Sequence, residues 1–204
     1  MSHSDRPVAA ITFDDGPSQK ITPEILKLLA QYNIPATFSV LGSLVSSYPD
    51  IVREASNMNC EIVNHSWNHE NFHKITENEI ADSILRTEDA IFNACHKHTT
   101  FVRPPYGCSD SRVTKIVKDM NKAQLFWNLD SLDWKSRDSH AIISKVINNI
   151  RSYDSILLHD IYVFSYDAVR TIIPELLARD YELVTVSELF SRKGITIMPG
   201  ERYP

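Results

Sequence analysis

The stretch VAAITFDDGPS, residues 8–18, places a short apolar run directly before two adjacent carboxylates and a Gly-Pro pair. Residues 8–13 have the length and the Val, Ile and Phe content of a buried strand, and Gly16 with Pro17 predicts a turn after it. Polar side chains are therefore expected at the carboxyl end of a strand. In folds of parallel strands, binding and catalytic residues gather at that end.

The same arrangement recurs along the chain, because short apolar runs alternate with longer stretches of helical periodicity. This alternation predicts an α/β fold of about seven strand-helix units with a parallel sheet. Polar clusters follow many strands rather than one switch point, which favours a barrel over an open doubly wound sheet. Thr22 is expected to cap the first helix ahead of Pro23. The expected strands are 8–13, 36–40, 61–64, 100–103, 124–129, 155–158 and 182–186, and the expected helices are 23–32, 43–58, 76–95, 111–121, 139–153 and 166–179.

Length and charge limit the class of protein. The chain of 204 residues is 43% hydrophobic and shows no linker, so we expect a single domain over residues 1–204, with Pro199-Gly200 in a closing loop. A net charge of -5 without a basic block argues against nucleic acid or an anionic membrane as the main partner. No apolar run approaches the roughly 18 residues of a membrane span, and the first residues lack the apolar stretch of a secretory signal. The chain is expected to be soluble, either cytoplasmic or the catalytic part of a secreted or cell-surface protein.

The cysteines give little guidance. Cys60, Cys95 and Cys108 are odd in number, which excludes a complete disulfide framework. Three reduced thiols, or one bridge with one free thiol, are both compatible with this number. The cluster Cys95-His96-Lys97-His98 carries metal-ligating side chains, but it lacks a second ligand pair at zinc-finger spacing, so a metal site there is disfavoured.

Two motifs after strands one and three carry candidate metal ligands. Asp14 and Asp15 can divide two tasks, because adjacent side chains at a strand end point in different directions: one carboxylate can bind a metal ion while the other faces a reacting water molecule. An ordinary turn in which these carboxylates cap backbone amides is the alternative. His65 and His69 are four residues apart and are expected on one side of a helical turn. With Asp15 they would supply three N and O ligands and leave positions open for water.

Three later motifs add candidate catalytic groups. In Arg103-Pro104-Pro105-Tyr106-Gly107 the prolines lack backbone donors, so the Tyr106 amide is the next one available to a developing oxyanion. Arg103 is expected to pair with a pocket carboxylate, with a salt bridge on the rim as the alternative. His159 follows an apolar strand, and a nearby carboxylate would raise its pKa and make it a general acid. Aromatic residues recur in these loops and suit stacking on sugar rings: Trp67, Tyr106, Trp127 and Trp134.

Together, five segments resemble the five motifs of the polysaccharide deacetylase family, carbohydrate esterase family 4, in the family's order. They are TFDDGPS, HSWNH, RPPYG, DSLDW and LLHD, and the resemblance spans about residues 11–189. It implies a distorted, incomplete (β/α) barrel. It also implies an enzyme that removes acetyl groups from glycans containing N-acetylglucosamine, such as chitooligosaccharides or peptidoglycan.

The resemblance also implies a role for each motif residue. Asp15, His65 and His69 would hold one divalent metal ion, zinc first, with cobalt or nickel as alternatives. The remaining residues would act around it: Asp14 as general base oriented by Arg103, His159 as general acid tuned by Asp133, Tyr106 as the oxyanion amide, and Trp134 and Leu157 as walls of the acetyl pocket. The partner would be an acetylated oligosaccharide or polysaccharide.

Some alternatives remain open at this level. An O-acetyl xylan esterase would use the same residues, and a catalytically inactive sugar-binding relative would keep the fold. Glycoside hydrolysis fits poorly, because its two acids are separated by roughly 5 to 10 Å and it needs no histidine pair. Two departures from the family pattern concern specificity: Ser39 replaces a frequent aromatic, and residues 161–164, Ile-Tyr-Val-Phe, replace small glycines and predict a narrower groove near His159.

Overall fold

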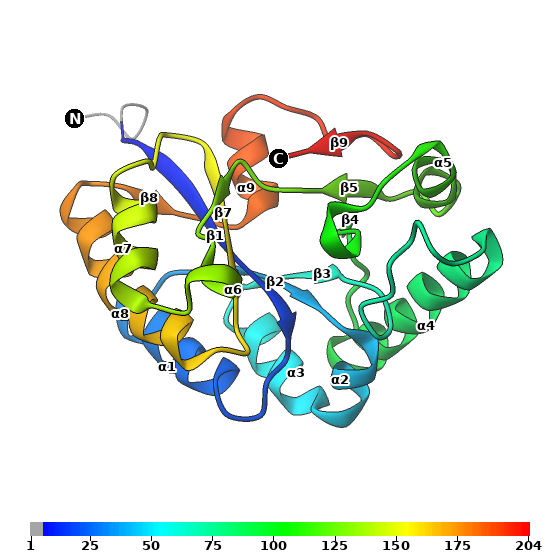
Figure 1. Ribbon diagram of the computed structural model, residues 1–204, viewed down its shortest axis with the longest axis horizontal. Helices are drawn as coiled ribbons and strands as arrows, with labels where there is room; N and C mark the ends of the chain where they lie inside the picture. The colour runs from blue at the N-terminus through cyan, green and yellow to red at the C-terminus, as the bar shows by residue number, and fades with distance from the viewer. Residues whose placement is uncertain (1–5) are drawn as a thin grey trace.

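The computed structural model describes residues 6–204, which form one curled sheet with most of the helices packed on its outer face (Figure 1). The strand order is β6-β7-β1-β2-β3-β4-β5-β9, with β8 also paired to β1, and every recorded pair is parallel. The predicted incomplete (β/α) barrel is thus confirmed. The strands are β1 (Val8–Gly16), β2 (Thr37–Val40), β3 (Glu61–Asn64), β4 (Phe101–Val102), β5 (Ala123–Leu125), β6 (Leu129–Asp130), β7 (Asp154–His159), β8 (Glu182–Leu183) and β9 (Arg202–Tyr203).

The helices follow most strands along the chain, as βα units require. None of those within residues 6–204 is both long and apolar enough to cross a membrane. They are α1 (Thr22–Tyr32), α2 (Gly42–Ser47), α3 (Pro49–Asn57), α4 (Glu77–Cys95), α5 (Ser111–Asp119), α6 (Asp133–Ser136), α7 (Ser139–Ile147), α8 (Val163–Ala178) and α9 (Val186–Arg192), with a single 3₁₀ turn at Pro105–Gly107.

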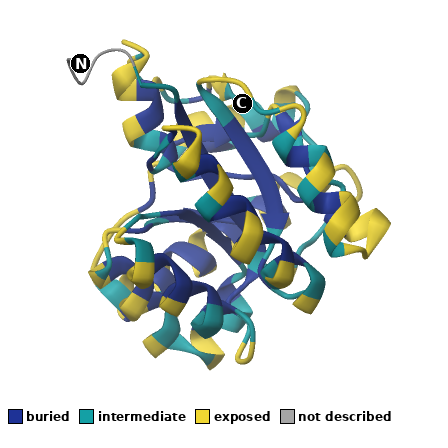
Figure 2. Cartoon of the chain, turned by 90° about the vertical axis from the view of Figure 1, so that its left-hand side faces the viewer, coloured by how far each residue is buried: buried dark blue, intermediate teal, exposed yellow. Residues whose placement is uncertain are grey.

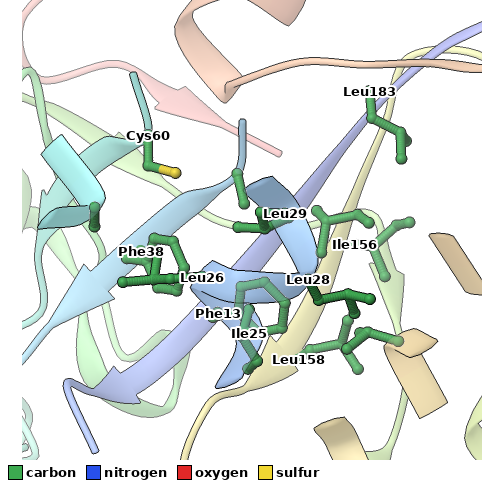
Figure 3. Close-up of a cluster of buried hydrophobic side chains, with 14 of the residues drawn as sticks. Phe13, Ile25, Leu26, Leu28, Leu29, Phe38, Cys60, Ile156, Leu158 and Leu183 are labelled. Atoms are coloured by element: carbon green, nitrogen blue, oxygen red, sulfur yellow. The ribbon is translucent and has the colours of Figure 1, made fainter. Parts of the chain in front are cut away.

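Successive side chains of β1 point to opposite faces of the sheet and therefore pack into two different apolar clusters. Its odd-numbered apolar residues, such as Ile11 and Phe13, belong to the large cluster between the sheet and the outer helices. In Figure 3, Phe13 lies beside Phe38 of β2 and the leucines of α1, and the two phenylalanine rings stack with centroids 5.3 Å apart. Val8 and Ala10 face the opposite way, into a second cluster with residues of α9. The same alternation turns Asp14 toward the inside of the half-barrel.

The outer helices cover the sheet with amphipathic faces. Figure 2 shows the buried residues on the strands and on the inward helix faces, while the exposed residues lie on the outward faces. In α1 the buried apolar side chains are Ile25, Leu26, Leu28 and Leu29, which fits the helical spacing of an apolar stripe. The large apolar cluster therefore fills the space between the sheet and the outer helices, and the carboxyl ends of the strands are left to polar residues.

Residues 126–128 cross the open side of the half-barrel. Strands β5 and β6 are neighbours in sequence but lie toward opposite ends of the strand order. The Phe126 amide donates to the carbonyl of Tyr203 in β9 at 2.6 Å, and the Asn128 amide donates to the carbonyl of Ser155 in β7 at 3.3 Å. The predicted strand 124–129 is therefore wrong as one element, because its middle leaves one sheet edge and joins the other.

Other predicted elements differ in their limits. The expected helix 43–58 is two helices, since Pro49 lacks the amide hydrogen that would continue α2 and begins α3 instead. The expected helix 139–153 ends at Ile147. The C-terminal residues form β9 beside β5 rather than only a closing loop.

The predicted cap of the first helix is also wrong. Ile21 occupies the cap position without a side-chain hydrogen bond. Thr22 lies inside the helix, and its hydroxyl accepts the Ser18 amide and donates to the Asp160 carboxylate. The three cysteines are free thiols, so no disulfide bridge joins them.

Candidate active site

A pocket of about 500 Å³ lies at the carboxyl ends of the strands, where the sequence places the polar motifs. Asp14 and Asp15 lie just before the end of β1 at Gly16, His65 follows β3, and His159 ends β7. Nearly all predicted site residues line this pocket; Arg103 and Asp133 lie behind it and contact its lining residues. Trp67 does not line it, and its ring instead packs against the Arg86 guanidinium. The lining residues are Asp14, Asp15, His65, His69, Pro104, Tyr106, Trp127, Asp130, Trp134, Leu157, His159 and Tyr162.

A bulge at the end of β1 brings both adjacent carboxylates into the pocket. Asp14 pairs with Ser39 of β2, whereas Gly16 already pairs with Val40, so Asp15 is an extra residue in the ladder. Its φ of 74° is left-handed. Regular alternation would have sent Asp15 toward the helices, away from Asp14. The two carboxylates instead share one pocket and differ in their partners.

Asp15, His65 and His69 bring three ligand atoms within 4.8 Å of one another. The Nε2 atoms of both histidines lie 3.3 Å from Oδ1 of Asp15. Among residues 6–204 no other group of three or more His, Cys, Asp or Glu side chains converges in this way. In particular, the Cys95–His98 cluster does not: His96 and His98 pack against the ring of Phe92.

The histidines reach Asp15 from an irregular loop and not from the predicted helical turn. Ser66 and His69 have φ values of 72° and 62°. The Ser66 hydroxyl accepts the His69 amide at 3.0 Å, which fixes the direction of the second histidine. The two histidines, four residues apart, thus both reach Asp15 because of the shape of this loop and not because of helical periodicity.

The chemistry of these three residues fits a divalent metal ion. Oδ1 of Asp15 is buried and has no hydrogen-bond partner, which leaves it available as a ligand. Nδ1 of His65 lies 2.7 Å from the Arg103 carbonyl, so this nitrogen carries a hydrogen, and Nε2 is the ring atom that faces Asp15 and is placed to bind an ion. Two imidazole nitrogens and one carboxylate oxygen are a ligand set typical of catalytic zinc-type sites.

The ionisation of two of these ligands also suits a cation. Burial by itself raises the pKa of Asp15, but His65, His69 and His159 outweigh it and lower that pKa to about 2. Burial, together with the charge of His65, lowers the pKa of His69. At neutral pH the carboxylate is therefore ionised and His69 is neutral, as metal ligands must be.

Asp14 is held by a buried arginine. Arg103 is fully buried, and its Nη1 lies 2.5 Å from Oδ1 of Asp14 and donates to the Thr12 hydroxyl at 2.9 Å. Its Nη2 donates to the Phe126 carbonyl at 2.8 Å. The rim salt bridge considered from the sequence is therefore wrong for Arg103. Oδ2 of Asp14 lies 3.7 Å from Nε2 of His65, so the carboxylate stands beside the metal-type group.

His159 faces the pocket from the end of β7 and is backed by Asp133. Nδ1 of His159 lies 2.7 Å from Oδ1 of this buried carboxylate. Burial alone would lower the pKa of His159, but the hydrogen bond and charge of Asp133, with the charges of Asp14 and Asp15, raise it to about 9. The imidazole is consequently protonated at neutral pH and can donate a proton.

Aromatic and apolar residues form the rest of the pocket. Tyr106 has a φ of 59°, and its exposed ring lies edge-on to His69 with centroids 4.4 Å apart. Trp134, from α6, is 47% exposed, while Leu157 of β7 is buried at the pocket wall. Tyr162 stacks on Phe164 at 4.8 Å and lies 6.0 Å from the ring of His159. The residues 161–164 thus do contribute a large side chain beside His159.

Sequence reasoning missed several supporting residues. The Ser165 hydroxyl donates to Oδ2 of Asp133 at 2.6 Å, and only its position six residues after His159 hints at this contact. Asp160 was read as part of a motif without a role. Its fully buried carboxylate lies so close to Gly16 that a Cβ there would collide with it. Burial chiefly, and the charges of Asp15 and Asp14, raise the pKa of Asp160 to about 7 against the lowering effect of the Thr22 hydrogen bond.

A parallel half-barrel with a metal-type triad beside a carboxylate and a histidine is the kind of site that metal-assisted hydrolases use. A model of the family described as polysaccharide deacetylase matches residues 2–125. The chain therefore belongs to the polysaccharide deacetylase family. Family membership and the three ligand atoms together indicate a divalent metal ion.

Individual relatives agree with this assignment. A peptidoglycan-N-acetylglucosamine deacetylase, PgdA, of Listeria monocytogenes is 34% identical over 95% of this chain, which spans only 40% of that protein. A chitooligosaccharide deacetylase of Bradyrhizobium is 31% identical, with 93% of this chain and 87% of that protein covered. The structure of a family 4 acetyl xylan esterase from Clostridium thermocellum with a cobalt ion is 34% identical, covers 96% of this chain and 97% of its own, and superimposes with a TM-score of 0.89.

Proposed function

We propose that this chain is a metal-dependent hydrolase that removes acetyl groups from glycans containing N-acetylglucosamine, either chitooligosaccharides or peptidoglycan, and releases acetate. The observation that carries the proposal is the convergence of three groups in one pocket: the Asp15, His65 and His69 triad, the Asp14 carboxylate, and the protonated His159. We further propose that residues 1–204 act as a single catalytic domain.

We propose zinc as the native metal, with cobalt or nickel as functional substitutes. Zinc favours four-coordinate sites with imidazole nitrogen and carboxylate oxygen ligands, and a catalytic site keeps a position open. When bound, a divalent ion would lower the pKa of a water molecule and polarise an acetyl carbonyl.

Asp14 is proposed as the general base. Its Oδ1 is occupied by the charge-assisted contact with Arg103, while Oδ2 points toward the side of His65 and can accept a proton from the attacking water. The Arg103 guanidinium keeps the carboxylate in this orientation. The backbone amide of Tyr106 would donate to the oxyanion that develops on the acetyl group.

His159 is proposed as the general acid that protonates the leaving amine. An amine leaves poorly as an anion, so the bond to carbon breaks only when the nitrogen receives a proton. Asp133 fixes the tautomer and the direction of the ring through Nδ1, which leaves Nε2 to carry the transferred proton. Leu157 and Trp134 would enclose the acetyl methyl group, and the exposed rings of Tyr106 and Trp134 would contact the sugar.

A second activity, hydrolysis of O-acetyl esters of xylan, uses the same attacking water. It is favoured by the similarity to a protein named as an acetyl xylan esterase. The two activities differ in their need for His159, because an alkoxide leaves more readily than an amine. The pocket can therefore serve both, and the ratio of amide to ester hydrolysis is a property to measure.

The test is acetate release from chitotetraose, peptidoglycan and acetylated xylan by protein stripped with a chelator, before and after addition of zinc or cobalt. Metal-restored release that is lost in Asp14→Asn is the expected result. Asp130→Asn is a matched control, because Asp130 also lines the pocket but its Oδ1 already accepts the Leu132 amide.

The possible outcomes separate the candidate functions. Release that survives chelation would contradict a metal-dependent mechanism. Binding of these glycans without acetate release under either metal would instead indicate a sugar-binding protein that retains the fold. Preference for acetylated xylan would assign the esterase activity in place of the amide hydrolysis.

A further inference from the structure

The loop that carries His65 and His69 is conformationally unusual. Ser66 and His69 both have left-handed backbone conformations without being glycine. Such residues are strained and persist only when their surroundings hold them in place. The Ser66 hydroxyl already holds the His69 amide, so the position of Ser66 determines where His69 lies.

Asn64 is the residue that holds Ser66. It ends β3, is fully buried, and its side-chain Oδ1 accepts the Ser66 amide at 3.1 Å. Its Nδ2 donates to the carbonyl of Ile84 and to Oε1 of Glu88, both at 2.9 Å and both in α4. Because carbonyl and carboxylate oxygens accept only, the amide group of Asn64 has one permitted orientation, with its oxygen toward the histidine loop.

Glu88 is in turn held by a buried cation. Its Oε2 lies 2.7 Å from Nζ of Lys122, and its Oε1 accepts the Thr99 hydroxyl at 2.6 Å. Nζ of Lys122 also donates to the Thr99 carbonyl at 2.7 Å. None of these three residues lines the active-site pocket. A buried ion pair contributes little net stability relative to apolar residues of the same volume. What the Glu88–Lys122 pair provides beyond such residues is a fixed orientation of the Asn64 side chain.

We propose that Asn64, oriented by the Glu88–Lys122 ion pair, is a positioning residue that sets the metal affinity of the site through Ser66 and His69. The hydrogen bonds form one continuous path from the ion pair to the second histidine ligand. The inference rests on the metal site of the proposed function. It adds Asn64, Glu88 and Lys122, none of which lines the pocket.

The experiment measures the dissociation constant of cobalt, and the visible absorption band of the bound ion, for metal-stripped protein. Glu88→Gln and Asn64→Asp each break the path. The first variant presents amide hydrogens to Lys122, whereas the second lacks the donors that bind Glu88. Each is expected to weaken cobalt binding by about 10-fold or more, the range found for groups that orient metal ligands. The band should also change, because the ligand geometry changes.

The double variant Asn64→Asp with Glu88→Gln exchanges donor and acceptor. The new glutamine amide can donate to the new aspartate, which still accepts the Ser66 amide, so cobalt affinity is expected to recover relative to Asn64→Asp alone. The recovery is expected to be partial, because the Ile84 carbonyl has lost its donor in both aspartate variants. Glu61→Gln is the matched control at the other end of β3. It replaces a glutamate that binds Ser187 instead of the histidine loop, and it should leave the affinity within about 2-fold.

Thermal unfolding of each stripped variant keeps stability separate from positioning. Cobalt affinity that is unchanged in both single variants would overturn the inference. So would affinity that follows the unfolding temperature alone, with no recovery in the double variant. Failure of the unaltered protein to bind cobalt would reject the metal site itself, and the inference with it.

Discussion

Asp133 contacts His159 at two points: its Oδ1 lies 2.7 Å from the ring nitrogen Nδ1, and its Oδ2 accepts the backbone amide of the same histidine at 2.8 Å. The carboxylate thus fixes both the ring and the strand end that carries it. Ser165 donates to Oδ2 as well, so Asp133 has no freedom to turn away. Asp133 therefore supplies the geometric support of His159 and the largest part of the electrostatic support that raises its pKa.

This contact predicts the alkaline limit of activity. Burial would lower the pKa of His159, but Asp133 and the pocket carboxylates raise it to about 9, so the donated proton is lost as the pH rises through that value. Asp133→Asn removes the charge and should move the alkaline limb of kcat/KM to lower pH. The profiles are measured on chitotetraose with the same metal in both proteins. An alkaline limb that stays in place would contradict the assignment of that limb to His159.

Loss of His159 should separate amide from ester substrates. In His159→Ala the amine has no proton donor, so deacetylation of chitotetraose should fall by roughly 10²–10⁴-fold. Hydrolysis of an activated acetate ester should fall much less, because its leaving group is stable without a proton. Both rates are measured on one preparation, with cobalt affinity as the control for an intact site. Equal losses on the two substrates would count against a role as general acid.

Arg103 and Asp14 should be energetically coupled. Arg103→Met leaves the buried Asp14 carboxylate without its cation, and breaking a buried pair in this way costs about 3–5 kcal/mol. Adding Asp14→Asn removes the unpaired charge, so the double variant should be less destabilised than the sum of the single variants. The free energies of unfolding of the metal-stripped unaltered protein, both single variants and the double variant, measured in urea, give the coupling energy between the two side chains. Additive losses would show that the two side chains do not interact in solution.

Asp160 should make stability depend on pH. Its pKa is raised to about 7 in the folded protein, above its ordinary value of 3.8. Between these values the unfolded chain has lost the proton and the folded chain keeps it, so stability falls as the pH rises from about 4 to 7. Asp160→Asn removes this dependence. Relative to the unaltered protein, its stability should rise over that range by on the order of 4 kcal/mol.

The Asp160 comparison is made by urea unfolding at several pH values in the presence of a chelator, so that a bound ion does not contribute. Asp154→Asn is a control, since Asp154 is half-buried at the opposite end of β7. Parallel pH curves for Asp160→Asn and the unaltered protein would mean that the buried carboxyl does not retain its proton.

The sequence predicts the half-barrel and the neighbourhood of the site, because both depend on local patterns. Apolar runs mark the strands, and parallel strands bring their carboxyl ends together whatever the details of the loops. The bulge at Asp15 and the left-handed residues of the histidine loop do not follow from local sequence patterns. They exist because neighbouring strands and α4 hold them, as the hydrogen bond from Ser66 to Asn64 illustrates.

Long-range supporting contacts are the part that the sequence does not reveal. Glu88 and Lys122 are 34 residues apart, and Thr12 lies 91 residues from Arg103, with no spacing that marks either pair. The break at Pro49 is different, since its missing amide is visible in the sequence and predicts the end of a helix. The division of 124–129 between two sheet edges follows only from the closure of the half-barrel.

Residues 126–128, which cross from one sheet edge to the other, form a part of the pocket rim that is distinct from the strands that carry the site residues. The crossing is tied at Phe126 by its amide to Tyr203 and by its carbonyl to Arg103, and at Asn128 by both the amide and the side chain of that residue to β7. None of these ties involves the side chain of Trp127 between them. Trp127 is the member of the crossing that lines the pocket. Substitutions of Trp127 can therefore alter the rim of the pocket while the strand ladder that carries Asp15 stays intact. Protein engineers who wish to redirect this scaffold to other acetylated polymers should begin at that tryptophan.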